Sequence, residues 1–155
     1  MFRIEYLKLT EHPQLGNIEL FLSDIDEIDN IDKPYTSLII GPNGTGKSFI
    51  LRTISDILTQ FNIFQTSGVR SINLPFSFNI RYKFEKDTFE ITSSFIVHDK
   101  NKVNRTFNYY KNRPFTPINV KSEKDFKIYK IDFKDLLYPS HVIVNSVMLN
   151  DRFLF

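Results

Sequence analysis

The residues that most clearly predict chemistry lie between positions 41 and 48, in the run Gly-Pro-Asn-Gly-Thr-Gly-Lys-Ser. Their spacing satisfies the pattern G-x-x-x-x-G-K-[ST] of a phosphate-binding loop. Glycines adopt backbone conformations closed to residues with a Cβ, so the N–H groups of the loop can approach phosphate oxygens. We expect Lys47 to contact the β- and γ-phosphates of a nucleotide and Ser48 to offer its hydroxyl to Mg²⁺. The predicted binding residues are Gly41, Asn43, Gly44, Thr45, Gly46, Lys47, Ser48 and Phe49, with Ser48 also the predicted metal ligand.

Two elements have to position this loop. Residues 35–40 (YTSLII) form a short apolar run that predicts a buried strand entering the loop. After the loop, apolar residues recur at helical spacing and predict an amphipathic helix from about 46 to 61. The positive end of that helix would face a bound phosphate. This strand–loop–helix setting favours a working nucleotide site, and the alternative is a loop that has lost the ability to bind nucleotide.

The rest of the chain reads mainly as strands. Residues 2–9 and 18–22 predict a first hairpin. Residues 76–84 and 89–97 predict a second one, in which aromatic and aliphatic residues recur with a period of two. A loop with two prolines follows, then a strand over 126–133. Residues 141–147 (HVIVNSV) predict a last buried strand.

Composition excludes several classes of protein. The chain has 155 residues, 41% of them hydrophobic and 25% charged, which fits one globular domain and excludes a disordered tail. It has no cysteine, which excludes a disulfide framework and a thiolate metal site. No signal peptide and no apolar run of membrane-spanning length is found. We expect no membrane partner and a cytoplasmic location.

The charge is unevenly distributed along the chain. Residues 1–36 carry three basic and eight acidic side chains, a net charge of −5, whereas residues 100–134 carry ten basic and three acidic ones, a net charge of +7. Aromatic residues are interleaved with the basic ones, which would suit contact with the backbone and bases of DNA or RNA. The alternative is that the lysines are the solvated face of strands whose aromatic side chains enter the core.

The wording GPNGTGKS resembles the Walker A loop of ABC-type ATPases, and in particular of the branch that includes SMC proteins, RecF-type ATPases and OLD-like phage-defence ATPases. The two predicted strands ahead of the loop are similar to the opening of those ATPase heads. The resemblance implies an α/β fold with α+β character, namely the N-terminal lobe of a P-loop NTPase with an antiparallel β-rich subdomain. Residues 1–61 would hold the hairpin, loop strand and helix, residues 62–140 a β-rich insert, and residues 141–155 a strand leading to a glutamine-bearing loop.

The same resemblance implies ATP and Mg²⁺ as cofactors and a second ATPase head, or a C-terminal lobe, as partner. It implies a role in DNA-related or phage-defence processes. The chain departs from the family in two places. Residues 11–14 (EHPQ) replace an Asn-Phe-Arg-Ser-like turn, and no glutamine follows residues 141–147, where Asn145, Ser146 and Asn150 are the amides and hydroxyls at hand.

Residues for cleaving the nucleotide are missing from the sequence. A family ATPase also needs an apolar strand that ends in Asp-Glu, a signature sequence and a switch histidine. Asp99 and Asp132 each end a strand-like run but fit poorly. Hydrolysis would therefore require a C-terminal lobe or a partner chain. His12, His98 and His141 lack metal-ligand spacing, so we expect structural or surface roles.

A small P-loop kinase, transferring a phosphoryl group to a metabolite or nucleotide, is the alternative that chain length allows. It predicts parallel β–α repeats and an arginine-bearing lid. The region 72–134 instead reads as antiparallel strands.

Overall fold

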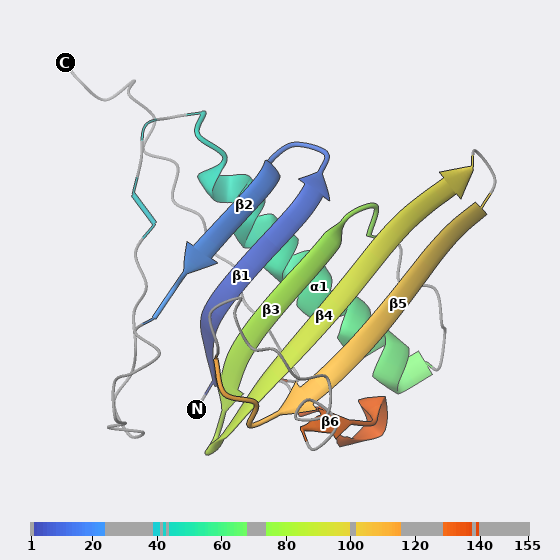
Figure 1. Cartoon of the computed structure of the whole chain (residues 1–155). Coiled ribbons are helices and arrows are strands. Elements are labelled where there is room, and N and C mark those ends of the chain that lie inside the picture. Colours follow the sequence, from blue (N-terminus) through green and yellow to red (C-terminus); the bar gives the residue numbers. More distant parts are fainter. Residues whose placement is uncertain are drawn as a thin grey trace.

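The computed structural model describes residues 2–23, 39–40, 42, 44–67, 74–99, 102–115, 129–137 and 139. In this part of the chain, one six-stranded sheet carries a single long helix on one face (Figure 1). The elements are β1 (Phe2–His12), β2 (Gly16–Phe21), α1 (Lys47–Ser67), β3 (Ser77–Phe84), β4 (Asp87–Asp99), β5 (Lys102–Lys111), β6 (Lys130–Ile131) and a 3₁₀ turn, η1 (Phe133–Asp135).

The strands follow the order β2-β1-β3-β4-β5-β6, and every pairing among them is antiparallel. The chain leaves the sheet after β2, forms α1 and returns as β3 beside β1. The pairing of β1 with β3 therefore joins the two predicted hairpins in one sheet. The sheet therefore contains strands from both of the expected parts of the chain, residues 1–61 and residues 62–140.

The expected fold class, an α/β lobe of the P-loop NTPase type, is wrong. The described residues form an antiparallel sheet with one helix and not parallel strands joined by helices. The physical reason lies in the connection through α1, because β3 returns beside β1 in the opposite direction and the two strands form no parallel β–α–β unit. The strand expected at 35–40 lies mainly outside the described residues, and Ile39 and Ile40 are not in a strand.

Several individual elements were predicted well. Both hairpins are confirmed, as β1–β2 and β3–β4, and the helix is confirmed but continues to Ser67. Strand β5 was not predicted. Of the strand expected over 126–133, residues 126–128 lie outside the described residues, and β6 covers two of the described ones. Residues 141–155 lie outside the described part. No helix among the described residues combines the length and apolar character needed to cross a bilayer.

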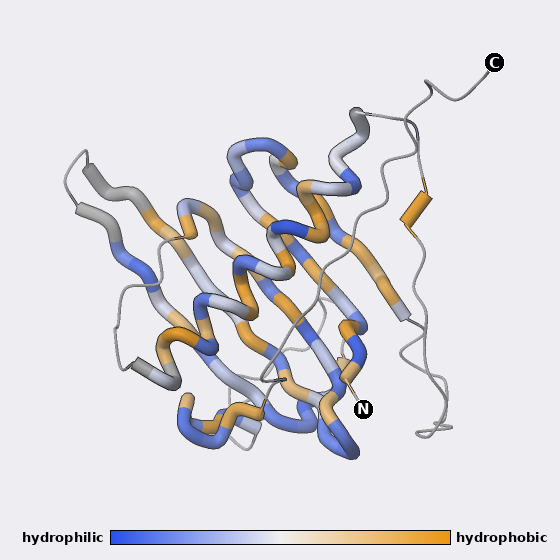
Figure 2. Tube along the Cα trace, turned by 180° about the vertical axis from the view of Figure 1, so that it is seen from behind, coloured by the Kyte–Doolittle hydropathy of each residue, from blue (hydrophilic) through white to orange (hydrophobic). Residues whose placement is uncertain are grey.

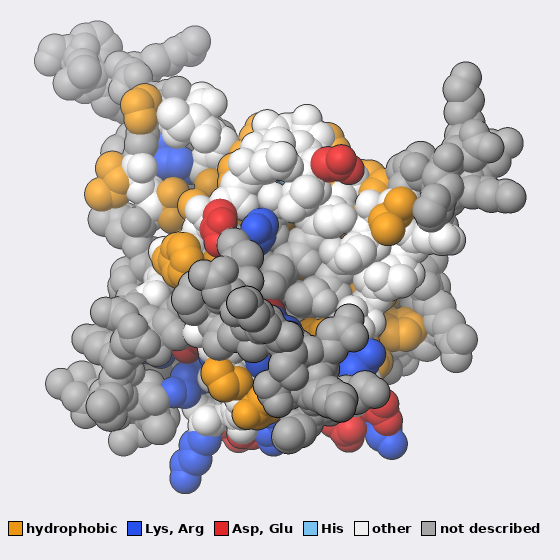
Figure 3. All heavy atoms as spheres, viewed as in Figure 1, with side chains coloured by type: hydrophobic (Ala, Val, Ile, Leu, Met, Phe, Trp, Pro, Cys, Tyr) orange, Lys and Arg blue, Asp and Glu red, His pale blue; other side chains and the backbone are white. Residues whose placement is uncertain are grey.

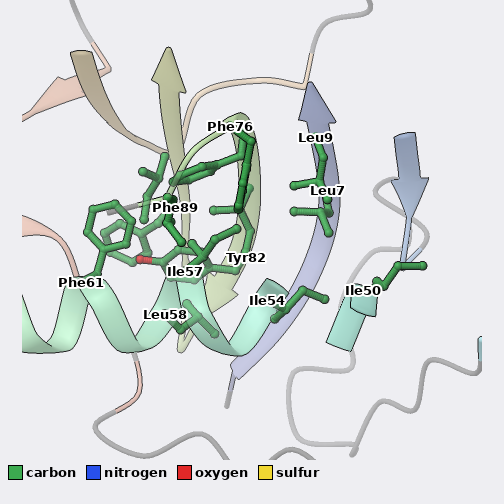
Figure 4. Packing of buried hydrophobic residues seen from close by; sticks show 14 of the residues in the cluster. Leu7, Leu9, Ile50, Ile54, Ile57, Leu58, Phe61, Phe76, Tyr82 and Phe89 are labelled. Atoms are coloured by element: carbon green, nitrogen blue, oxygen red, sulfur yellow. The ribbon is translucent and has the colours of Figure 1, made fainter. Parts of the chain in front are cut away.

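The face of the sheet that meets α1, here called the inner face, is apolar. The helix crosses the strands obliquely and points its apolar side at them (Figures 2 and 4). Phe61 of α1 is fully buried and makes ring contacts with Phe78, Phe107, Tyr109 and Phe133. The buried cluster consists of Leu7, Leu9, Ile50, Ile54, Ile57, Leu58, Phe61, Leu74, Phe76, Phe78, Ile80, Tyr82, Phe89, Ile91 and Leu136.

The opposite face, here called the outer face, buries charges. Arg81 donates from Nε to Glu5 at 3.1 Å and lies 3.8 Å from Glu90. Arg113 donates to both carboxylate oxygens of Glu90, and Asn79 donates to the same carboxylate at 2.8 Å. Glu5, Arg81 and Glu90 are each no more than 6% exposed.

A second cluster on the outer face is aromatic. The rings of Tyr6, Phe21 and Phe115 contact one another, and the guanidinium of Arg81 lies 5.5 Å from the centre of the Phe115 ring. The hydroxyl of Tyr6 donates to Glu19 at 2.7 Å. Figure 3 views the molecule from this side. The ring of Phe115 and the carbonyl of Arg113, which accepts from Arg81 at 2.7 Å, bring the segment after β5 over the charged cluster.

An irregularity in β1 makes this outer face possible. The register with β3 runs from Ile4 opposite Tyr82 directly to Tyr6 opposite Arg81, so Glu5 is an extra residue in the ladder. Such a bulge places two successive residues on one side of a strand. Glu5 and Tyr6 consequently both contact outer-face residues, while Ile4 and Leu7 pack in the core.

Candidate phosphate-binding site

The predicted loop leads into the N-terminus of α1, beside the β1–β2 hairpin (Figure 1). Gly41 and Asn43 lie outside the described residues. Gly44 and Gly46 have φ angles of +82° and +89°. These values are in the region that glycine adopts without strain and that residues with a Cβ avoid. The two glycines thus have backbone conformations that a side chain at either position would disfavour.

Lys47 folds back over its own loop. Its Nζ donates to the carbonyl oxygen of Pro42 at 2.5 Å and lies 3.5 Å from Oγ1 of Thr45. The Thr45 hydroxyl donates to the same carbonyl at 2.8 Å. The ammonium group therefore lies over the loop, where an incoming phosphate oxygen can replace the Pro42 carbonyl as its acceptor.

The first turn of α1 supplies further donors. The first helical hydrogen bond runs from the N–H of Ile50 to the carbonyl of Gly46 at 3.0 Å. The N–H groups of Ser48 and Phe49 precede it in the first turn, and N–H groups at this place in a helix are the usual donors to a bound anion. No acidic residue lies in this first turn. The positive end of the helix is thus not neutralised by its own side chains, which favours an anion there.

Ser48 is the predicted ligand of Mg²⁺, and its side chain is exposed beside the loop. Among the described residues, no group of three or more histidine, cysteine, aspartate or glutamate side chains that could hold a metal is present. Mg²⁺ commonly keeps several waters and binds through substrate phosphates with few protein ligands. A single hydroxyl next to a phosphate loop is therefore compatible with Mg²⁺ only when a phosphate chain binds with it.

Phe49, the last predicted binding residue, is 43% exposed on the outside of the first helical turn. Ile40, ahead of the loop, is 82% exposed. Both leave apolar surface next to the glycines, where an uncharged part of a ligand could pack.

The sequence did not reveal that the β1–β2 turn contacts this loop. A Cβ added to Gly46 would lie 2.6 Å from Cδ2 of Leu15, so the loop backbone and the Leu15 side chain are in close contact. His12, expected to be structural or on the surface, is buried and holds this turn. A histidine at the end of a strand has many roles, and nothing in residues 11–15 marks them as neighbours of a loop 30 residues later.

The acids considered for cleavage chemistry do not reach the loop. Asp132 is exposed, pairs with Lys134 at 3.8 Å and adjoins Phe133, which contacts Phe64 near the C-terminal end of α1. Residues 47 and 64 are about 25 Å apart along a helix. Asp99 ends β4, where its backbone pairs with Lys102 at the tip of the β4–β5 hairpin. His98 is described only as a backbone position in β4, and His141, Asn145, Ser146 and Asn150 lie outside the described residues.

The described cations of the basic region 100–134 largely have partners within the chain. Arg105 lies over the rings of Phe95 and Phe107, and burial lowers its pKa. Lys111 pairs with Asp87 at 2.8 Å, and Arg113 pairs with Glu90. These side chains support the sheet. Lys121, Lys124 and Lys127 lie outside the described residues.

Comparison of the chain with protein-family models, curated proteins and solved structures finds no match.

Proposed function

We propose that this protein binds ATP together with Mg²⁺ through residues 41–49. The observation that supports the proposal best is the pair of left-handed glycines, Gly44 and Gly46, directly before a 21-residue helix whose first residue is Lys47. This combination brings backbone donors, a helix terminus and an ammonium group to one place, all suited to a chain of phosphates.

The residues would divide the work as follows. The N–H groups of the loop and of the first helical turn would donate to the β-phosphate. Lys47 would exchange the Pro42 carbonyl for β- and γ-phosphate oxygens, and Ser48 would hold Mg²⁺, which neutralises phosphate charge when bound. Phe49 would pack against an uncharged part of the nucleotide.

Hydrolysis is a separate proposal. The resemblance of GPNGTGKS to ABC-type ATPases supports a second ATPase head or a C-terminal lobe as the source of the catalytic acid. Asp132 lies at the opposite end of α1, and Asp99 ends a strand at a hairpin tip. We therefore expect ATP binding without turnover by this chain alone. A DNA-related or phage-defence role and a cytoplasmic location remain predictions that depend on the resemblance and on composition.

No specific observation favours either alternative, the small P-loop kinase or the nucleic-acid-binding module. The kinase predicted parallel strands, and each strand pairing in the described part of the chain is antiparallel. Nucleic-acid binding by region 100–134 predicted accessible cations, and Arg105, Lys111 and Arg113 are engaged with rings or carboxylates.

The proposal is tested by calorimetry with ATP and Mg²⁺ on the wild type, Lys47→Ala and the matched control Lys134→Ala. Lys134 is exposed and pairs only loosely with Asp132 at 3.8 Å, so its loss removes the same charge far from the loop. We expect Lys47→Ala to weaken binding by about a hundredfold, as loss of a charged hydrogen bond to phosphate would. Lys134→Ala should bind as the wild type does.

Equal binding by the wild type and Lys47→Ala, or no binding by a folded wild type, would contradict the proposal. Ser48→Ala tests the metal. We expect it to remove most of the gain in affinity that Mg²⁺ provides while leaving metal-free binding nearly unchanged. Phosphate release by the pure wild-type chain would overturn the separate proposal that catalysis needs further residues.

A further inference from the structure

We propose that His12 is a positioning residue of the phosphate loop, because it holds the β1–β2 turn so that Leu15 keeps Gly46 and the start of α1 in the binding conformation. The expected effect of His12 on ATP affinity rests on the proposed function. The structural part of the proposal concerns the loop alone and can be tested without nucleotide.

The first link is the ring of His12, which ties the turn to the helix. Its Nδ1 accepts the N–H groups of Gln14 and Leu15, both at 3.2 Å. Its Nε2 lies 3.0 Å from Oγ1 of Thr53, which is buried in α1. Because backbone N–H groups can only donate, Nδ1 carries no proton, and Nε2 is the nitrogen that donates to Thr53.

The ring is well fixed in this position. It packs on Phe76, with ring centres 4.5 Å apart, and is 7% exposed. The contacts that the structure gives it in the described residues are with uncharged groups, namely Gln14, Leu15, Thr53 and Phe76. Burial lowers the pKa of His12 below 6.5, so the neutral ring that these bonds need is the form present at neutral pH.

The second link is Leu15, which joins the turn to the loop. Its side chain packs against the core and leaves no room for a Cβ on Gly46, as the 2.6 Å approach shows. In the described part of the loop, the hydrogen bonds from Lys47 and Thr45 to the Pro42 carbonyl run within the loop, whereas the contact of Leu15 with Gly46 comes from the β1–β2 turn. Leu15 thus connects the loop to the sheet, and His12 fixes Leu15.

The expected effect on ATP affinity follows from the fraction of molecules in which the loop has its binding conformation. If the loop adopts its binding conformation only part of the time, the apparent dissociation constant rises by the inverse of that fraction. A loop that is competent in about one molecule in ten would bind ATP about tenfold more weakly. Lys47 would still make its full contribution whenever the loop is formed.

The first experiment measures amide hydrogen exchange of residues 44–48 in the nucleotide-free protein. We expect faster exchange in His12→Ala and Leu15→Ala. His12→Asn should restore slow exchange, because its side-chain oxygen can accept the same N–H groups from the place of Nδ1. Thr53→Val removes the bond to Nε2 at nearly constant volume, and Thr66→Val is its matched control near the other end of α1. We expect faster amide exchange in the loop of Thr53→Val and unchanged exchange in Thr66→Val.

The second experiment measures ATP·Mg²⁺ affinity of the same variants, with circular dichroism to verify folding. Affinity about tenfold weaker in Leu15→Ala and Thr53→Val, and unchanged in Thr66→Val, would support the proposal. Loop exchange unchanged in folded Leu15→Ala and Thr53→Val would overturn it, even if ATP binds normally. Variant-dependent loop exchange in a protein that binds no ATP would support the coupling and overturn the proposed function.

Discussion

The two faces of the sheet are buried in different ways. The inner face is closed by α1 with interlocking apolar side chains, of which Phe61 is the centre. The outer face buries Glu5, Arg81 and Glu90 by pairing them with one another and with Arg113. Truncating a buried apolar side chain removes its contact area and leaves a cavity, whereas removing one partner of a buried ion pair leaves an uncompensated charge behind. The inner face should therefore respond most to loss of side-chain volume, and the outer face to changes of charge.

The largest expected effect is on the inner face. Phe61→Ala should lower the free energy of unfolding by about 3–5 kcal/mol, because it empties a fully buried site surrounded by four rings. Thermal or urea unfolding measures this. Ile63→Ala, two residues along the same helix and 44% exposed, is the control and should change stability by less than about 0.5 kcal/mol. Similar losses in both variants would contradict the packing described.

The next effect tests the outer face. Glu90→Gln keeps the shape but removes the charge between Arg81 and Arg113, and should cost about 3 kcal/mol in urea unfolding. Glu19→Gln is the control, since Glu19 is 44% exposed in its ion pair with Lys8 and should contribute less than about 1 kcal/mol. A Glu90→Gln protein as stable as the wild type would show that the outer cluster is not charge-dependent.

A smaller effect concerns pH and the inner-face ring of His12. Burial lowers its pKa below 6.5, so the unfolded chain binds a proton at this position before the folded protein does. The free energy of unfolding should therefore fall as the pH drops from neutral through 6.5 toward the lower folded pKa. Comparing urea unfolding of the wild type and His12→Asn across this window checks the expectation. If His12 does not cause the fall, the difference in the free energy of unfolding between the wild type and His12→Asn should not change with pH.

The smallest effect compares one hydroxyl on each face. Tyr82 donates to the carbonyl of Leu137 at 2.8 Å from the inner face, and Tyr82→Phe should cost about 1 kcal/mol. Tyr6 donates to the half-exposed Glu19 at 2.7 Å from the outer face, and Tyr6→Phe should cost less, since solvent can replace that bond. Thermal unfolding measures the loss of stability in each variant. A larger loss in Tyr6→Phe than in Tyr82→Phe would show that solvent does not replace the hydrogen bond to Glu19.

The inner face was predictable because its spacing is local. Alternating large apolar residues in 76–84 predicted β3, and apolar residues at helical spacing predicted α1. The outer face was not predictable. Arg81 and Glu90 occupy the polar positions of alternating strands, which read as solvated, and burial there depends on a segment that folds back after β5.

Long-range contacts account for most of the other failures. The pairing of β1 with β3 brings together segments about 70 residues apart, which no local pattern specifies. Strand β5 was not predicted as an element, but the alternative that aromatic side chains of the region 100–134 enter the core is confirmed for Phe107 and Tyr109. In the candidate site, the glycine pattern predicted the loop, while the contact of Leu15 with Gly46 depends on how the first hairpin lies beside the helix.

The extra residue in β1 has a consequence for how this strand tolerates changes in length. Deleting a residue from a regular strand exchanges its two faces from that point on. Deleting Glu5 would instead leave Ile4, Tyr6 and Leu7 in plain alternation, with the core residues still facing α1. The sheet should still form after that deletion, although Arg81 loses its ion pair with Glu5. Deletion of Lys8, which lies in a regular part of the strand, should prevent folding. Circular dichroism of the two deletion variants would show whether position 5 is the place where this strand can gain or lose a residue.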